Sequence, residues 1–174
     1  MNQKGFTLIE LLVATSVIVI ISSIFLADYK TGQRQFALER SAHKLAQDLR
    51  RAEELSMSAK SYDCGNDDYK MKGYGINFIT DNNFYSLQAR CEHKDYPGDP
   101  LFYNEQTIEE IDLEKKVIIS GLTTNPLDVF FYPPVPETDL GGTNEAVITL
   151  SIETEPSQAK SVKANKTGLI YVAD

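Results

Sequence analysis

The chain opens with a long apolar run. Between Phe6 and Ala27 every residue is apolar or carries a small hydroxyl group, except the acidic Glu10. As a helix, this run rises about 33 Å at ~1.5 Å per residue, close to the thickness of a bilayer's hydrocarbon core. It passes into the next segment without the cleavage site of a secretory signal peptide. The pattern therefore predicts a membrane-spanning helix over residues 6–27.

An amphipathic pattern follows between residues 28 and 60. Apolar and small residues recur there at steps of three and four, as one face of a helix requires. Because the first proline is Pro97, we expect one nearly unbroken helix from Phe6 to about Ala59, with Gly32 as its softest point. The apolar stripe either packs on the rest of the chain or pairs two chains in a coiled coil. It consists of Leu38, Ala42, Leu45, Leu49, Ala52, Leu55 and Ala59.

Beyond Lys60 the pattern changes to short strands. Residues 73–79 and 84–90 flank the polar turn 81–83, which predicts a hairpin. One helix followed by a series of strands is typical of an α+β fold, here a long N-terminal helix packed on a mostly antiparallel β-sheet. Further strands are expected at residues 116–120, 128–132, 146–153, 161–164 and 169–172, the last two joined by a turn at 165–168.

Two stretches of this region interrupt the strand pattern. The segment Asp95–Glu114 contains two prolines, a glycine and many acidic residues, so we expect a long exposed loop. Pro133, Pro134 and Pro136 follow the strand expected at 128–132. Because proline cannot donate a hydrogen bond to a neighbouring strand, that strand is expected at a sheet edge or to end abruptly.

Charge is distributed unevenly along the chain. The formal net charge is −8, and the 174 residues suffice for one modest globular head. Residues 29–60 contain seven basic and four acidic side chains, a balance of +3, whereas residues 61–174 contain nine basic and nineteen acidic ones, a balance of −10. The difference allows the head of one chain to contact the helix of another, and it is equally compatible with solvated faces that have no partner.

The two cysteines, Cys64 and Cys91, follow the amphipathic helix and end the predicted hairpin. In an exported head they are expected to form a disulfide, which in the chain-entropy model is worth about 3 to 4 kcal/mol for a loop of this length. Two free thiols in a reducing compartment are the alternative, because a count of cysteines does not establish pairing.

Candidates for catalysis or metal binding are few. His43 and His93 lie in different elements without a nucleophile nearby in the sequence, so we expect no enzyme and no cofactor. We expect His43 on the solvent side of the helix. Asp63, Asn66, Asp67 and Asp68 form an oxygen-rich group without the spacing of a calcium-binding EF-hand, so a solvated loop is expected rather than a metal site.

Glu10 is the one ionisable residue inside the apolar run. A carboxylate at membrane depth requires a partner, so Glu10 is expected to be functional unless it reaches the membrane interface. If the chain were cut between Gly5 and Phe6, the new α-amino group would lie near Glu10 in the sequence. The carboxylate would be satisfied by that amino group either in the same chain or in a neighbouring chain.

The contiguous residues Lys4-Gly5-Phe6-Thr7-Leu8-Ile9-Glu10-Leu11-Leu12-Val13 resemble the class III signal of type IV pilins and type II secretion pseudopilins. The resemblance implies a leader at residues 1–5, cleavage between Gly5 and Phe6 by a prepilin peptidase, and N-methylation of Phe6. It further implies a cytoplasmic N-terminus and a head outside the cytoplasm. Glu10 would then neutralise the amino terminus of an adjacent subunit during assembly.

Four later motifs are similar to the GspH/FimT group of minor pseudopilins and pilins: residues 45–52, 73–78, 129–133 and 167–172. The resemblance implies a structural subunit that lies in the inner membrane before entering a filament in the periplasm or at the cell surface. Its implied partners are other pilin or pseudopilin subunits, the prepilin peptidase, the inner-membrane assembly platform and membrane lipid.

Two other functions stay open. A DNA-binding minor pilin of an uptake system is one alternative, supported by Lys160, Lys163 and Lys166, although the acidic head makes nucleic acid an unlikely partner. The other alternative is a head on a single membrane anchor that binds a protein partner and enters no filament. An uncleaved Gly5–Phe6 bond would favour that second alternative.

Overall fold

The computed structural model describes residues 7–58, 60–134 and 137–173, without the side chains of residues 24–28, 30, 31 and 137. The chain divides into two compact units, Met1–Phe36 and Ala37–Asp174. One helix, α1 (Leu8–Met57), begins in the first unit and ends in the second. The second unit contains the strands of the described chain and is called the head unit below.

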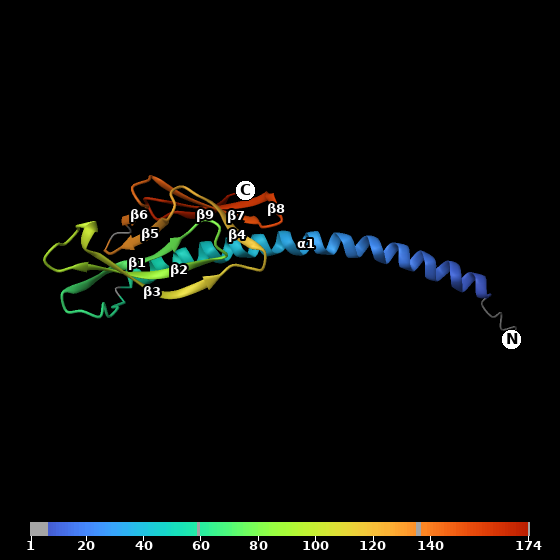
Figure 1. The fold of residues 1–174 in the computed structure, drawn as a ribbon, viewed down its shortest axis with the longest axis horizontal. Coiled ribbons are helices and arrows are strands. Elements are labelled where there is room, and N and C mark those ends of the chain that lie inside the picture. The colour runs from blue at the N-terminus through green and yellow to red at the C-terminus, as the bar shows by residue number, and fades with distance from the viewer. Residues whose placement is uncertain (1–6, 59, 135–136, 174) are drawn as a thin grey trace. The chain divides into compact units, whose positions relative to one another are not determined.

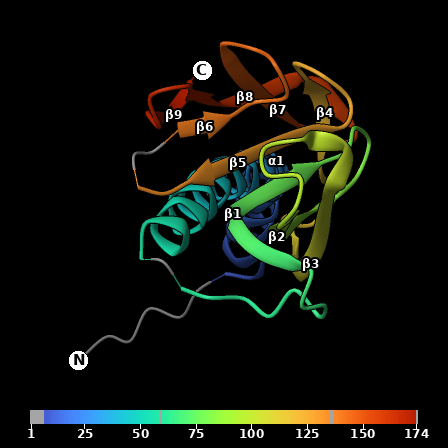
Figure 2. The ribbon, with the colours of Figure 1, turned by 90° about the vertical axis from the view of Figure 1, so that its left-hand side faces the viewer.

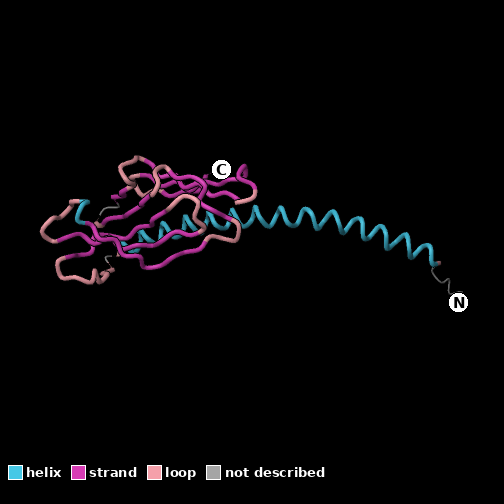
Figure 3. The backbone as a smooth tube through the Cα atoms, viewed as in Figure 1, coloured by secondary structure: helices cyan, strands magenta, loops and turns pink. Residues whose placement is uncertain are grey.

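Two antiparallel sheets form most of the head unit (Figures 1 and 3). The five-stranded sheet has the order β3-β2-β1-β5-β6, and the four-stranded sheet has the order β4-β7-β8-β9. A short 3-10 helix, η1 (Pro100–Phe102), precedes β3. The strands are β1 (Tyr69–Phe78), β2 (Phe84–His93), β3 (Tyr103–Asp112), β4 (Val117–Leu122), β5 (Leu127–Tyr132), β6 (Glu137–Asp139), β7 (Glu145–Ile152), β8 (Glu155–Asn165) and β9 (Ile170–Ala173).

The part of α1 that lies in the head unit supplies the centre of its core. Seen along the helix, β1 and β5 lie close beside α1 (Figure 2). Leu45 and Leu49 have no exposed surface, and they belong to one apolar cluster that also contains Ile76 of β1 and Ile148 of β7. The chain therefore covers the apolar stripe of α1 from Leu38 to Leu55 with its own two sheets.

Polar side chains along α1 attach the helix to the strands. The Tyr85 hydroxyl donates to Asp48 Oδ2 at 2.6 Å, and burial, followed by the Asp48 carboxylate, raises the pKa of Tyr85. The Tyr74 backbone N–H donates to Ser56 Oγ at 2.8 Å. Because these polar groups are bonded where they are buried, they fix the position of the helix over the sheet at little desolvation cost.

Basic side chains of α1 contact acidic side chains and a backbone carbonyl of the same chain. Arg40 pairs with Glu114 at 3.3 Å, and Arg51 pairs with Glu109 of β3 at 3.0 Å. The Lys44 ammonium donates to the backbone carbonyl of Asp112 at 3.1 Å. The side chains of both ion pairs are about half exposed, so each pair contributes at most about 1 kcal/mol. Arg40 and Arg51 of α1 thus have acidic partners without a second subunit.

Two glycines of β1 let the neighbouring strand β5 approach closely. A Cβ atom at Gly75 would come within 2.5 Å of the Phe130 ring, and one at Gly73 would come within 2.8 Å of the Tyr132 ring. Both rings belong to the neighbouring β5. Any larger residue at either position would displace that strand, so these glycines set the close packing of β1 and β5.

The α+β, pilin-like fold class and the hairpin of β1 and β2 are confirmed. The exposed loop predicted at Asp95–Glu114 is wrong, because residues 103–112 form β3, which pairs with β2 along its length. The single predicted sheet is two sheets, and the short strand β6 was not predicted. Because β6 pairs with β5, β5 is no edge strand, although it does end just before Pro133.

We expect a chain that lacks Met1–Ala27 to be folded and monomeric. Both sheets cover the apolar stripe of α1, so the shortened protein has no exposed seam that would pair two copies. Circular dichroism and size-exclusion chromatography with light scattering measure folding and mass. A stable dimer or an aggregate would show instead that the stripe is an oligomer interface.

In the same shortened chain, Leu49→Ala should lower the free energy of unfolding by about 2–5 kcal/mol, because it leaves a cavity between α1 and the sheets. The matched control is Gln47→Ala, at an exposed position of the same helix, with an expected change within about 0.5 kcal/mol. Chemical denaturation followed by circular dichroism measures both values. Equal values for the two variants would contradict the central place of Leu49 in the core.

Candidate functional site

The N-terminus of α1 is closed by a reciprocal pair of bonds between Thr7 and Glu10. The Thr7 backbone N–H and its hydroxyl donate to Glu10 Oε2 at 3.0 and 2.9 Å. In return, the Glu10 backbone N–H donates to Thr7 Oγ1 at 3.4 Å. This arrangement is a capping box, in which each residue satisfies an amide of the first helical turn that has no partner within the helix. The Glu10 carboxylate is thereby held toward the start of the helix.

Large apolar side chains between Leu8 and Ile21 are exposed in the single chain. Their exposed fractions lie between 47% and 82%. They include the consecutive runs 11–13 and 17–21, so they surround the helix rather than forming a single stripe. A helix that is apolar on all sides requires an apolar surrounding, either lipid or other helices.

The hydroxyl groups in this run bond back to the helix itself. Thr15, Ser16 and Ser23 donate to the carbonyls of Leu12, Val13 and Ile20 at 3.0, 2.8 and 2.7 Å. A hydroxyl that is satisfied within its own helix needs no water. Together with the Thr7–Glu10 cap, these bonds leave this part of α1 suited to an environment without water.

Within the described residues, no helical segment combines the length and the apolar character that crossing a membrane requires. The span predicted for residues 6–27 stays a prediction. Its first residue, Phe6, and the Gly5–Phe6 cleavage junction lie outside the described residues.

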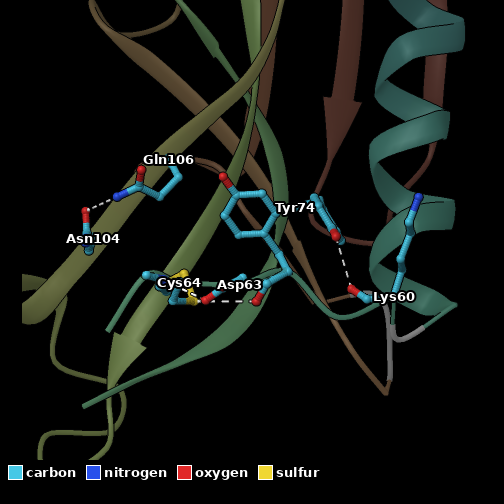
Figure 4. Close-up of a disulfide and its surroundings, with 9 residues drawn as sticks. Lys60, Asp63, Cys64, Tyr74, Asn104 and Gln106 are labelled. Carbon is cyan, nitrogen blue, oxygen red and sulfur yellow. Dashed lines mark hydrogen bonds between the residues drawn. A yellow bond between two sulfur atoms is a disulfide. The ribbon is translucent and has the colours of Figure 1, made fainter. Parts of the chain in front are cut away.

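The two cysteines are bonded to each other in the structure (Figure 4). Cys64 lies in the connection between α1 and β1, and Cys91 lies in β2, with little or no exposed surface at either. Beside them, the Tyr74 hydroxyl donates to the Lys60 carbonyl at 3.0 Å. The disulfide therefore fastens the segment after the helix to the second strand of the hairpin.

The remaining sequence candidates do not form a common site. His43 is exposed on α1, as predicted, whereas His93 lies among the rings of Tyr69, Tyr96 and Phe102. The residues of the acidic loop, Asp63, Asn66, Asp67 and Asp68, are exposed. Across the described part of the chain, no group of three or more His, Cys, Asp or Glu side chains is arranged to hold a metal ion.

The three lysines that supported DNA binding do not share a surface. Lys160 and Lys163 lie in β8, where the pairing with β7 is regular from Lys160 to Asn165. Residues three apart in a regular strand point to opposite faces of the sheet. Lys163 also lies 3.6 Å from Glu145, so part of its charge is already neutralised.

Residues 1–26 match the family model of the prokaryotic N-terminal methylation motif. This motif is typical of type IV pilins and pseudopilins, and it implies processing by a prepilin peptidase and assembly with other pilin-like subunits. No curated protein and no solved structure matches the chain. The predicted resemblance at the N-terminus is therefore confirmed at the level of this motif, which covers 26 of the 174 residues.

We expect Cys64 and Cys91 of the exported protein to be oxidised, because their sulfur atoms are bonded in the folded chain. Mass spectrometry of protein alkylated without reduction should detect no alkylated cysteine. Cys64→Ser combined with Cys91→Ser should lower the free energy of unfolding by about 3 kcal/mol, as loss of a loop closure of this length does. Two alkylated thiols in the exported protein would contradict the prediction.

Proposed function

We propose that the protein is a minor pseudopilin or minor type IV pilin, a non-enzymatic subunit of a filament for protein secretion or pilus assembly, most similar to the GspH/FimT group. The observation that carries this proposal is the exposed apolar surface of α1 between Leu8 and Ile21, which lies within the segment that matches the methylation motif. Such a surface requires burial. Lipid would bury it before assembly, and the helices of neighbouring subunits would bury it afterwards.

In this proposal the precursor is inserted in the inner membrane with its head outside the cytoplasm. The prepilin peptidase cuts between Gly5 and Phe6 and N-methylates Phe6, and the assembly platform moves the mature subunit into the filament. The Cys64–Cys91 disulfide supports this orientation, because structural disulfides persist in oxidising compartments and are rare in the cytosol.

The capped conformation of Glu10 supports a role for its carboxylate in assembly. In the single chain Glu10 Oε2 reaches back to the Thr7 backbone N–H at 3.0 Å, one residue from Phe6. Cleavage would convert the Phe6 amide into a positively charged amine at this end of the helix. In a filament, a carboxylate held there is placed to meet the amine of an adjacent subunit, so that neither charge is buried alone.

Two substitutions of Glu10 separate its role as a helix cap, through its bond with Thr7, from its role as a negative charge. A glutamine at position 10 retains an oxygen that can accept from the Thr7 N–H, but it carries no negative charge. An alanine retains neither. The pair of variants therefore distinguishes the helix cap from the charge.

We expect both Glu10→Ala and Glu10→Gln to be inserted in the membrane and cleaved after Gly5, and neither to enter filaments at the level of the unmodified protein. The reason is that the Phe6 amine of a neighbouring subunit would lack its counter-charge. The variants are co-expressed with the cognate assembly machinery, and both processing and recovery in sheared fibres are measured.

Recovery of Glu10→Gln at the normal level, with loss of Glu10→Ala alone, would show that Glu10 acts only as a helix cap. Normal recovery of both variants would remove Glu10 from the assembly contacts. A chain that is never cut after Gly5 would favour the single-anchor alternative over a filament subunit.

A further inference from the structure

A polar cavity of about 760 Å³ lies at one end of the five-stranded sheet. Its walls come from segments far apart in the sequence: Lys70 and Lys72 of β1, Tyr103 of β3, Tyr132 of β5, Asp139 of β6, and Lys166 in the β8–β9 turn. Its volume falls within the range of sites that bind small molecules or short peptide segments. Neither α1 nor the disulfide is among the described residues that line the cavity.

A buried arginine organises the side of the cavity formed by β5 and β6. The Arg90 guanidinium lies 3.6 Å from the centre of the Phe130 ring and is 6% exposed. It donates to Glu105 Oε1 at 2.6 and 2.9 Å, to Asp139 Oδ2 at 2.8 Å, and to the Tyr132 hydroxyl at 2.6 Å. Burial alone would lower the pKa of Arg90, but Tyr132 and Glu105 raise it overall, so this side is a fixed ionic network.

Lys72 projects into the cavity because β1 is irregular there. Met71 pairs with Cys91 and Gly73 pairs with Arg90, so Lys72 is an extra residue, a β-bulge, in β1. Bulges redirect side chains and are frequent beside functional sites. The Lys72 ammonium lies 4.3 Å from the centre of the Tyr103 ring, contacts the Tyr103 hydroxyl, and lies 3.3 Å from Glu92 Oε2.

The two carboxylates of the wall already have hydrogen-bond donors. Glu92 receives Lys70 on Oε1 at 3.3 Å, and on Oε2 it receives both Lys72 at 3.3 Å and the Gly98 N–H at 3.1 Å. Burial acts to raise the pKa of Glu92, but these donors lower it overall, so the carboxylate stays ionised. Asp139 receives the Gly141 N–H on Oδ1 at 3.1 Å and Arg90 on Oδ2.

Donor groups, in contrast, are in excess. Each lysine has three N–H donors, and the Tyr103 oxygen accepts from Lys72, which leaves the hydroxyl hydrogen of Tyr103 to donate elsewhere. Lys166 is exposed and forms no ion pair with another described residue. Among its described residues the wall thus carries three lysines and two carboxylates, Glu92 and Asp139, in a chain whose net charge is −8. A ligand that fits must supply acceptors and negative charge.

We propose that this cavity binds a carboxylate group presented by a short acidic peptide segment of a partner protein. The lysines and the Tyr103 hydroxyl, which line the cavity together with Tyr132, receive the carboxylate of such a segment. Nucleic acid is the less favoured ligand, because its binding requires a basic surface that neutralises several successive phosphates, whereas this wall sets two carboxylates, Glu92 and Asp139, beside its three lysines. The proposal does not depend on the filament function.

The test uses the full-length protein in a non-ionic detergent and a fluorescein-labelled pentaglutamate peptide, with binding followed by fluorescence anisotropy. We expect saturable binding that weakens as salt is added, and no binding of the matched pentaglutamine peptide. Lys166→Gln should weaken binding about threefold, as expected for an exposed ion pair. Lys72→Gln should weaken it about tenfold or more, because a more buried, charge-assisted hydrogen bond is lost.

Lys115→Gln is the matched control, because Lys115 is exposed between β3 and β4 and does not line the cavity. It should leave the affinity unchanged within about twofold. Equal binding of the two peptides, no pentaglutamate binding in the millimolar range, or equal effects of Lys115→Gln and Lys166→Gln would overturn the proposal. A single-stranded oligothymidylate that binds more tightly than pentaglutamate, with the same loss in Lys166→Gln, would assign the cavity to nucleic acid instead.

Discussion

The head unit depends on the burial of one face of α1 under two β-sheets. Ala42, Ala46 and Ala52 are small enough to let the strands approach the helix, and Leu45 and Leu49 fill the space between them. Burial of one such leucine contributes about 1.5–3 kcal/mol, a large fraction of the stability of a small domain. The same helix is apolar on every side further toward its N-terminus. One continuous helix therefore carries two patterns of apolar residues, a single face within the head unit and all sides toward its N-terminus.

The sequence predicted the elements with strong periodicity. The helix and the hairpin were found because their apolar residues follow periods of 3.6 and 2. Strand β3 was not predicted because it is an edge strand in which most residues are exposed and several are acidic. It is a strand because it pairs with β2, not because of its own sequence pattern. The division into two sheets was missed for a related reason. The pairing of β1 with β5 joins residues about fifty positions apart, and no local pattern encodes such a pairing.

The candidate sites also differed in how far a local sequence pattern could predict them. The motif Thr7-x-x-Glu10 before an apolar run is a local signature of a capping box, so the bonds between these two residues could have been predicted. The network around Arg90 could not, because Glu105, Tyr132 and Asp139 come from three other strands. Lys160 and Lys163 illustrate the reverse error. They are close in the sequence, but the register of β8 separates them.

The disulfide also determines how the chain would carry a mechanical load. A filament subunit held by its N-terminal helix is pulled through α1, and the tension reaches the rest of the chain at Cys64. Because Cys64 and Cys91 are bonded, that tension passes directly to the end of β2. Strand β1 and most of β2 lie inside the closed loop and bear none of it. The segment between the two cysteines, which are 27 positions apart, is about 90 Å long when extended, and it is thus withheld from stretching.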